Sequence, residues 1–151
     1  MTNTELKGKV ALVTGSARRV GKAIALDLAH QGMSLIVHHN RSVEDAAATA
    51  AEIRALGVDV IICQADQSQP DDIKGMFDQI RQHYGRIDLL VNNAANFEAG
   101  AILDMTFDDW HRSLSVNLDG PFLCSQHAAK LMRAAGTGGV IINIADLTAV
   151  R

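Results

Sequence analysis

The sequence predicts an α/β fold in which a doubly wound parallel sheet of five strands is covered by helices on both faces. Short apolar runs alternate with longer helical segments along the whole chain, as expected for repeated β-α units. The apolar runs are continuous rather than alternating in polarity, which is typical of strands buried on both faces. A length of 151 residues leaves room for about one domain.

The first unit is predicted from an apolar run and a glycine turn. Val10–Thr14 is expected to be the first strand, and Val20–Gln31 its helix, which ends at Gly32. Ser34–His38 follows as the second strand because it is short, apolar and rich in β-branched residues.

The next two helices have recognisable starts. Ser42 is a favourable N-cap for an alanine-rich helix over Glu44–Leu56, which stops at Gly57. The third strand is expected over Asp59–Gln64. Ser68-Gln69-Pro70 starts the following helix, with proline near its first turn, and that helix runs to about Tyr84.

The last units complete the pattern. Leu89–Asn92 is the fourth strand, and one long helix is expected from about Phe107 to Ala134. Gly136-Thr137-Gly138-Gly139 breaks this helix before the fifth strand, Val140–Ile144. The chain ends at Arg151 without a closing helix, so we expect a sheet truncated after strand five, with Val140–Ile144 as an apolar edge.

Composition narrows the classes of partner. The content of 48% hydrophobic residues is normal for a soluble globular protein. A net charge of −3 argues against a general nucleic-acid or membrane surface. Met1 to Lys7 is polar, and no apolar run approaches the ~18 residues of a membrane span. Cys63 and Cys124 lie in apolar stretches, which favours buried reduced thiols and a cytoplasmic protein over a disulfide.

The turn after the first strand predicts an anion site. Gly15 permits a sharp turn, and Gly21 permits close packing of helix and strand. A helix start offers unpaired N–H groups and about half a positive charge to a phosphate. A Walker A loop is disfavoured because Lys22 is followed by Ala23 instead of Ser or Thr. The alternative is an ordinary glycine-containing turn between strand and helix.

The segment Thr14 to Gly21 is similar to the Thr-Gly-x-x-x-Gly-x-Gly motif of the short-chain dehydrogenase/reductase family, with Arg19 in place of the middle glycine. Leu90-Val91-Asn92-Asn93-Ala94 resembles the Asn-Asn-Ala-Gly motif of that family, and Asp66-Gln67-Ser68 resembles the segment that contacts adenine. Val116-Asn117-Leu118 resembles the segment of the active-site asparagine. Taken singly, the asparagines could instead cap a strand or lie on a helix surface.

The resemblance covers the whole chain and implies that residues 1–151 are an incomplete dinucleotide-binding Rossmann domain. The catalytic helix and substrate part of the family would then be missing. The residues expected to bind the cofactor are Gly15, Arg18, Arg19, Val20, Gly21, His39, Asn40, Arg41, Ser42, Asp66, Gln67, Asn93 and Ala94.

The end of the second strand favours NADPH over NADH. An NAD enzyme usually places Asp or Glu there to accept bonds from the ribose 2′-hydroxyl, whereas this chain has His38-His39-Asn40-Arg41-Ser42. Arg41 can pair with a 2′-phosphate, Ser42 adds a donor, and Arg19 adds positive charge. Alternatively, Arg41 is a solvated loop charge. The two histidines predict no metal site, since adjacent strand residues face opposite ways and no third ligand is evident.

Some segments look like the pteridine reductase branch of the family. These are Arg19, the run from His38 to Ser42, Phe97 after Asn92-Asn93-Ala94-Ala95-Asn96, and Asp146 where most members carry a catalytic serine. The resemblance implies that Phe97 stacks on a pterin ring, that Arg19 contacts phosphate and pterin, and that Asp146 assists proton delivery. Ala95 departs from this branch. Phe97 could instead anchor the loop to the core, and Asp146 could cap a strand end.

The family resemblance implies hydride transfer from the reduced nicotinamide to a C=N or C=O carbon, with a tyrosine as proton donor and Asn117 holding a relay water. The tyrosine belongs to a Tyr-x-x-x-Lys motif, whereas Tyr84, the one tyrosine here, is followed at that spacing by Asp88. We therefore expect little or no turnover from this chain. The alternatives are a carbonyl or 3-oxoacyl reductase, a non-catalytic NADPH-binding module, or an assembly role. A small-molecule substrate and a homo-oligomer at full length are also expected.

Overall fold

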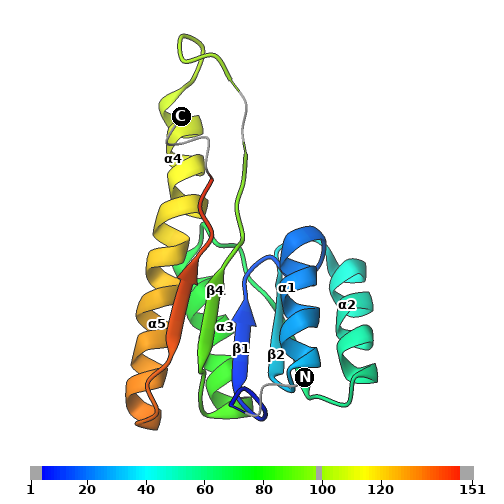
Figure 1. Ribbon diagram of the computed structural model, residues 1–151. Helices are drawn as coiled ribbons and strands as arrows, with labels where there is room; N and C mark the ends of the chain where they lie inside the picture. Colours follow the sequence, from blue (N-terminus) through cyan, green and yellow to red (C-terminus); the bar gives the residue numbers. More distant parts are fainter. Residues whose placement is uncertain (1–4, 98–99, 147–151) are drawn as a thin grey trace.

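The computed structural model describes residues 5–97 and 100–146, which form one parallel sheet flanked by helices (Figure 1). The strands are ordered β3-β2-β1-β4-β5, and every neighbouring pair is parallel. Their bounds are β1 Val10–Val13, β2 Ser34–His39, β3 Val60–Gln64, β4 Leu89–Asn92 and β5 Val140–Asn143. Each predicted strand is confirmed to within a residue or so at its ends.

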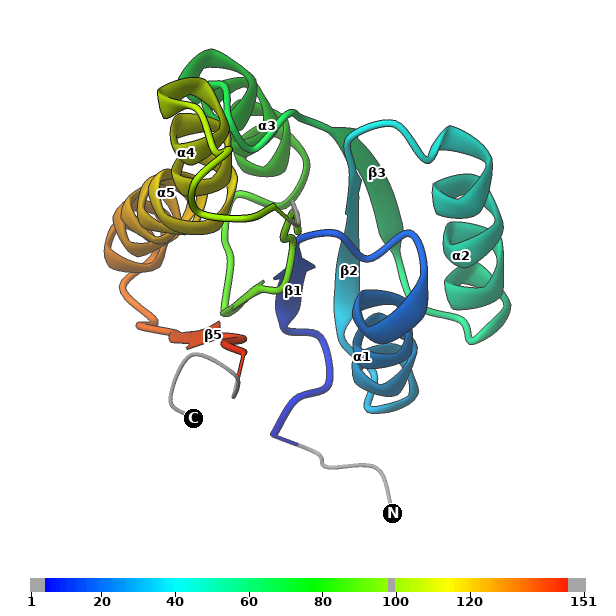
Figure 2. The same ribbon diagram turned by 90° about the horizontal axis from the view of Figure 1, so that it is seen from above.

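Helices cover both faces of this sheet, which confirms the doubly wound prediction (Figure 2). The helices and helical segments are α1 Arg19–His30, α2 Val43–Ala55, α3 Pro70–Tyr84, α4 Phe107–Leu114, η1 Ser115–Asp119 and α5 Gly120–Ala135. One apolar cluster joins α1 and α2 to one face of the sheet, and a second joins α3 and α5 to the other face. The continuous apolar strands predicted this burial, because their side chains alternate between the two clusters.

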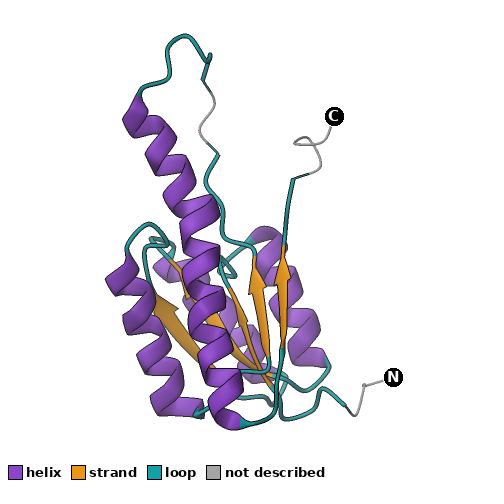
Figure 3. Cartoon of the chain, turned by 90° about the vertical axis from the view of Figure 1, so that its left-hand side faces the viewer, coloured by secondary structure: helices purple, strands orange, loops and turns teal. Residues whose placement is uncertain are grey.

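The predicted single helix from Phe107 to Ala134 is corrected by the structure, which interrupts it with the π-helical turn η1. The N–H of Gly120 donates to the carbonyl of Ser115, five residues earlier, and one extra residue is thereby accommodated in the turn. Pro121 follows at once and has no N–H to donate, so an ordinary α-helical ladder could not continue through this point. Together with the loop before it, the helix rises beyond the carboxyl ends of the strands (Figure 3).

Two smaller expectations concern the surface of the fold. Ser42 is the N-cap residue of α2, as predicted, but its side chain does not make the capping hydrogen bond. β5 is an edge strand, and Val140 and Ile142 remain 57% and 43% exposed, as the predicted apolar edge requires.

In the described ranges, no helix combines the length and apolar character needed to cross a membrane.

Among the glycines, Gly21 has the tightest surroundings, where α1 meets the turn that precedes it. A Cβ added at Gly21 would lie 2.4 Å from the carbonyl oxygen of Gly15 and 2.5 Å from Nδ2 of Asn93. Gly15 itself has a φ of 66°, and its added Cβ would lie 3.0 Å from Cα of Ala94. Glycine is therefore required at both positions, which agrees with the role predicted for them.

We expect Gly21→Ala to lower the free energy of unfolding by about 2 kcal/mol, because the added methyl group must displace backbone atoms. The matched change Gly75→Ala, in α3, meets no atom within 4 Å and should raise stability by about 0.5–1 kcal/mol. Urea denaturation of both variants measures the difference. Equal stability of the two would contradict the tight approach of α1.

Candidate functional site

The carboxyl ends of β1, β2, β3 and β4 surround an open pocket of ≈ 530 Å³. Such a crevice at the carboxyl edge is the usual ligand position in an open α/β sheet. Its lining comprises Gly15, Ala17, Arg18, Arg19, Val20, Gly21, His38, His39, Asn40, Arg41, Ser42, Asp66, Gln67, Asn93, Ala94, Ala95, Asn96 and Val116. Every residue that the sequence predicts as cofactor-binding lies in this lining.

The turn after β1 is held from the β4 side by Thr14 and Asn93. The hydroxyl oxygen of Thr14 accepts hydrogen bonds from the N–H groups of Asn93 and Ala94, each at 2.9 Å. Asn93 in turn donates from Nδ2 to the carbonyl of Thr14 at 2.8 Å. Asn93 therefore does more than cap a strand: it joins the two loops that form the floor of the pocket. Thr14 was not among the predicted site residues, although it opens the glycine motif.

The same turn is held from the β2 side by His38. The N–H of Gly15 donates to Nδ1 of His38 at 2.9 Å, and Nε2 lies 3.0 Å from the carbonyl of Ala65. Burial is the main cause that lowers the pKa of His38 to about 4, so the ring is neutral near pH 7. Sequence reasoning considered this histidine as a metal ligand and as part of the run from His38 to Ser42, but missed its contact with Gly15 because the two residues are distant in sequence.

The start of α1 faces the pocket with a strained residue. Arg19 has a φ of 53°, the left-handed region that favours glycine. The family motif has glycine at this position, and the positive φ gives the physical reason. As in any α-helix, the N–H groups of its first turn have no acceptor within the helix, and those of Arg19, Val20 and Gly21 belong to this turn of α1. They are available to an anion.

Charged groups gather where β2 and β3 end. Arg41 is exposed and lies in the pocket lining together with Asp66. Hydrogen bonds from the N–H and hydroxyl of Ser68 are the main cause that lowers the pKa of Asp66, with smaller contributions from Asn40 and Arg41. The carboxylate is thus ionised and largely engaged by Ser68, which leaves the Arg41 guanidinium at the rim.

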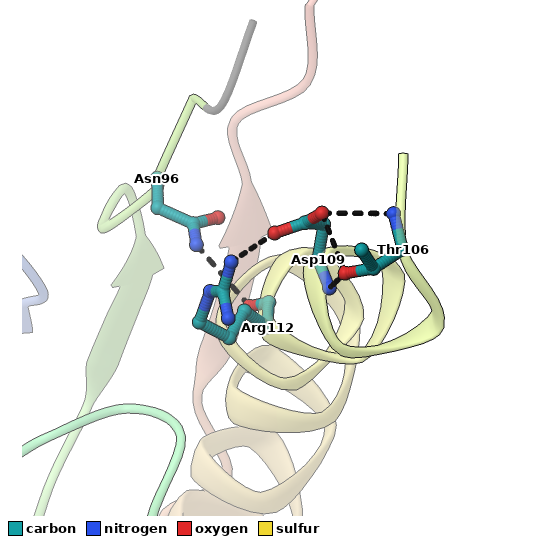
Figure 4. Close-up of polar contacts among 4 residues, drawn as sticks. All are labelled: Asn96, Thr106, Asp109 and Arg112. Atoms are coloured by element: carbon teal, nitrogen blue, oxygen red, sulfur yellow. Dashed lines mark hydrogen bonds and ion pairs between the residues drawn. The ribbon is translucent and has the colours of Figure 1, made fainter. Parts of the chain in front are cut away.

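The loop after β4 is attached to the long helix through Asn96. Its N–H donates to Oδ1 of Asn117 at 3.0 Å, and Asn117 Nδ2 donates back to the Asn96 carbonyl at 3.0 Å. Figure 4 shows the side chain of Asn96 reaching the carbonyl of Arg112, whose guanidinium pairs with Asp109. Asp109 also closes a capping box with Thr106 at the start of α4. Asn117 is exposed on the helix surface, as the alternative held, and its side chain is hydrogen-bonded to the loop.

Of the residues predicted to act on substrate, Arg19 lies in the pocket lining, whereas Phe97, Asn117 and Asp146 do not. Phe97 is 88% exposed, so it does not anchor the loop to the core, which was the alternative. Asn117 lies in η1 next to the lining residue Val116, and Asp146 is exposed beyond β5. Within residues 5–97 and 100–146, no three His, Cys, Asp or Glu side chains gather as a metal site would require. Both cysteines, Cys63 and Cys124, are free and buried.

Comparison with known proteins places this pocket in context. The family described as short chain dehydrogenase matches residues 9–150. A 3-oxoacyl-(acyl-carrier-protein) reductase of Synechocystis is 39% identical over 138 residues, which cover 91% of this chain and 56% of that protein.

Solved structures agree closely with the fold. A short-chain type dehydrogenase/reductase from Mycobacterium marinum has a TM-score of 0.91 and 35% identity, with 97% of this chain and 59% of that chain covered. A short chain dehydrogenase from Burkholderia cenocepacia, in complex with NADP, has a TM-score of 0.88 and 38% identity, with 97% and 58% covered. The chain spans a little over half the length of the curated relatives it matches.

The neutral His38 predicts a pH-dependent stability. Its pKa is about 4 in the folded protein against 6.5 as the ordinary value, so the unfolded chain takes up a proton that the folded chain does not. The free energy of unfolding should therefore fall as pH decreases from about 6.5 to 4, by up to about 3 kcal/mol.

Urea denaturation across this pH range measures the slope. His38→Gln should flatten it, whereas His30→Gln, at an exposed position on α1, should leave it unchanged. A slope that survives in His38→Gln would show that other groups are responsible.

Proposed function

Because this chain belongs to the short-chain dehydrogenase family, we propose that it binds NADPH for hydride transfer to a C=N or C=O carbon. The observation that carries the proposal is the composition of the pocket edge. It combines a glycine turn, the open first turn of α1 and a cationic end of β2, and no carboxylate stands at the end of β2.

The residues of the pocket fit such a dinucleotide. Gly15 and Gly21 leave a cradle that any Cβ would fill, and the N–H groups at the start of α1 would hold the diphosphate. Buried polar atoms of the lining, His39 Nδ1 and Gln67 Nε2, have no hydrogen-bond partner among the described residues. Buried polar atoms are usually paired, so a polar ligand at this edge would satisfy them. When bound, NADPH would supply the hydride.

The proposed preference for NADPH rests on the end of β2. Arg41 would pair with the 2′-phosphate and Ser42 would donate to it, while Arg19 adds charge from the turn. The carboxylate in the pocket lining, Asp66, is engaged by Ser68 and would contact the adenine side of the ligand. A 2′-phosphate would therefore meet guanidinium groups at the β2 end, and the acidic residues Glu44 and Asp45 follow only in the first turn of α2.

We expect Arg41→Ala to weaken NADPH binding about 10- to 100-fold, the effect of losing a hydrogen bond to a charged group. Its affinity for NADH should change little, because NADH lacks the 2′-phosphate. Isothermal titration calorimetry with both dinucleotides measures this. Arg133→Ala, an exposed arginine at the end of α5, is the control that should behave as wild type. Equal losses for NADPH and NADH would contradict the assignment of Arg41.

For the substrate, we propose a flat heteroaromatic ring of the pteridine or dihydrofolate kind. Phe97 presents an exposed aromatic face directly after the lining residues Ala95 and Asn96, and Arg19 lies at the neighbouring edge. Asp146 follows the carboxyl end of β5, where it would assist proton delivery. The second candidate is a carbonyl or 3-oxoacyl compound, which the similarity to the Synechocystis reductase favours.

We further propose that these 151 residues bind without turnover. Tyr84 cannot act as the proton donor, because its hydroxyl donates to the carbonyl of Leu35 at 3.3 Å, at the amino end of β2 and away from the pocket. Burial is the main cause that raises the pKa of Tyr84 well above its ordinary value, opposite to what an acid catalyst needs. A non-catalytic NADPH-binding module would bind the dinucleotide in the same way, so ligand binding, rather than turnover, tests the pocket.

With NADPH bound, we expect a dihydropteridine to bind this chain while the nicotinamide absorbance stays constant. Phe97→Ala should weaken that binding about 10-fold through loss of ring stacking, whereas Phe122→Ala, an exposed phenylalanine on α5, should not. Fluorescence titration with a dihydropteridine and with a 3-oxoacyl thioester measures both affinities. Tighter binding of the thioester, unaffected by Phe97→Ala, would favour the second candidate.

A further inference from the structure

We propose that His38 is a positioning residue for the dinucleotide: its imidazole fixes the turn after β1 in the shape that presents the start of α1 to the diphosphate. The inference rests on the proposed NADPH binding and adds a residue to it that is not expected to contact the ligand's phosphate groups. The argument follows from the hydrogen bonds around this side chain.

His38 fastens the turn to two strands. The N–H of Gly15 donates to Nδ1, and Nε2 lies within hydrogen-bond distance of the Ala65 carbonyl at the end of β3. The backbone adds a reciprocal pair with Ser16, in which the His38 N–H donates to Oγ and the Ser16 N–H donates to the His38 carbonyl. His38 is 1% exposed and Ser16 is fully buried, so water does not compete for these bonds.

The geometry requires one tautomer. Gly15 offers a donor, so Nδ1 must be unprotonated, and Ala65 offers an acceptor, so Nε2 must carry the hydrogen. A protonated ring would set an N–H against the Gly15 N–H. Burial disfavours the charged ring most strongly, and His39 on β2 adds to this effect. The Ala65 carbonyl and Asp66 after β3 favour the charged ring, but burial outweighs them.

The Gly15 peptide transmits this restraint to α1. The peptide that joins Thr14 to Gly15 is held by His38 at its N–H and by Nδ2 of Asn93 at its carbonyl. The Gly15 carbonyl belongs to the next peptide and lies 3.4 Å from the same Nδ2. Gly21 packs directly on that carbonyl and belongs to the first turn of α1. A rotation of the Gly15 peptide would therefore displace the N–H groups that face the diphosphate. Without His38 the Gly15 N–H would lose its acceptor, and Asn93 would hold the turn only through the carbonyls of Thr14 and Gly15.

Two substitutions separate positioning from general stabilisation. Oδ1 of asparagine is separated from Cα by as many bonds as Nδ1 of histidine, so His38→Asn keeps the acceptor for Gly15 and loses the contact with Ala65. Nε2 of glutamine corresponds likewise to Nε2 of histidine, so His38→Gln keeps the Ala65 contact and loses the Gly15 acceptor. His30→Asn and His30→Gln, on the exposed side of α1, are matched controls.

Calorimetry with NADPH and NADH, with urea denaturation of each variant, decides the question. We expect His38→Asn to retain NADPH affinity within about 3-fold and His38→Gln to lose about 10-fold or more, with the NADPH-to-NADH ratio unchanged in both. Equal losses in the two variants, or losses that follow their stability, would overturn the positioning role. Failure of the wild-type chain to bind either dinucleotide would instead overturn the proposed function.

A second measurement needs no variant. Nitrogen NMR of the wild-type imidazole should show the hydrogen on Nε2 and a hydrogen-bond coupling between the Gly15 amide and Nδ1. A ring protonated at Nδ1 near pH 7 would overturn the inference even if both variants failed to fold.

Discussion

The contact of Gly21 with the carbonyl of Gly15 is the constraint on which the carboxyl edge of this sheet depends. It brings the first turn of α1 against the turn after β1, so that helix N–H groups and the ends of β2 and β4 face one space. Neither glycine could hold this shape alone, since a glycine turn has many conformations available. Thr14 and Asn93 restrain it from one neighbouring strand and His38 from the other, which converts a flexible turn into a defined edge of the pocket.

Much of the fold was predictable from the local pattern of the sequence, because buried parallel strands appear as continuous apolar runs and helices end at glycine. Leu89–Asn92 agrees at both ends, and Pro70 begins α3 as expected. The π turn was not predictable from periodicity, since it arises from one shifted hydrogen bond beside Pro121. His38 and Thr14 were missed for a related reason: their partners, Ala65 and Asn93, come from other strands, and only the sheet order brings them together.

Arg19 illustrates how a site can keep a residue that its backbone disfavours. A non-glycine residue in the left-handed region costs on the order of 1 kcal/mol, and glycine at this position would remove that cost. Arg19 lies in the pocket lining, where its positive charge adds to that of Arg41. The strain and the charge together identify Arg19 as the position where backbone preference and ligand preference conflict.

The π turn also determines what a change in the length of the long helix would do to the orientation of α4. One extra residue in a turn rotates the preceding segment by about 100° relative to the following one, so the orientation of α4 depends on the residue count of η1. Deleting a residue there would rotate α4 relative to α5, swing the amide of Asn117 away from Asn96 and release the loop that carries Phe97. The segment Ser115–Asp119 thus sets the rotation of α4 relative to α5. A change in its length would alter the direction of α4 as well as how far it extends.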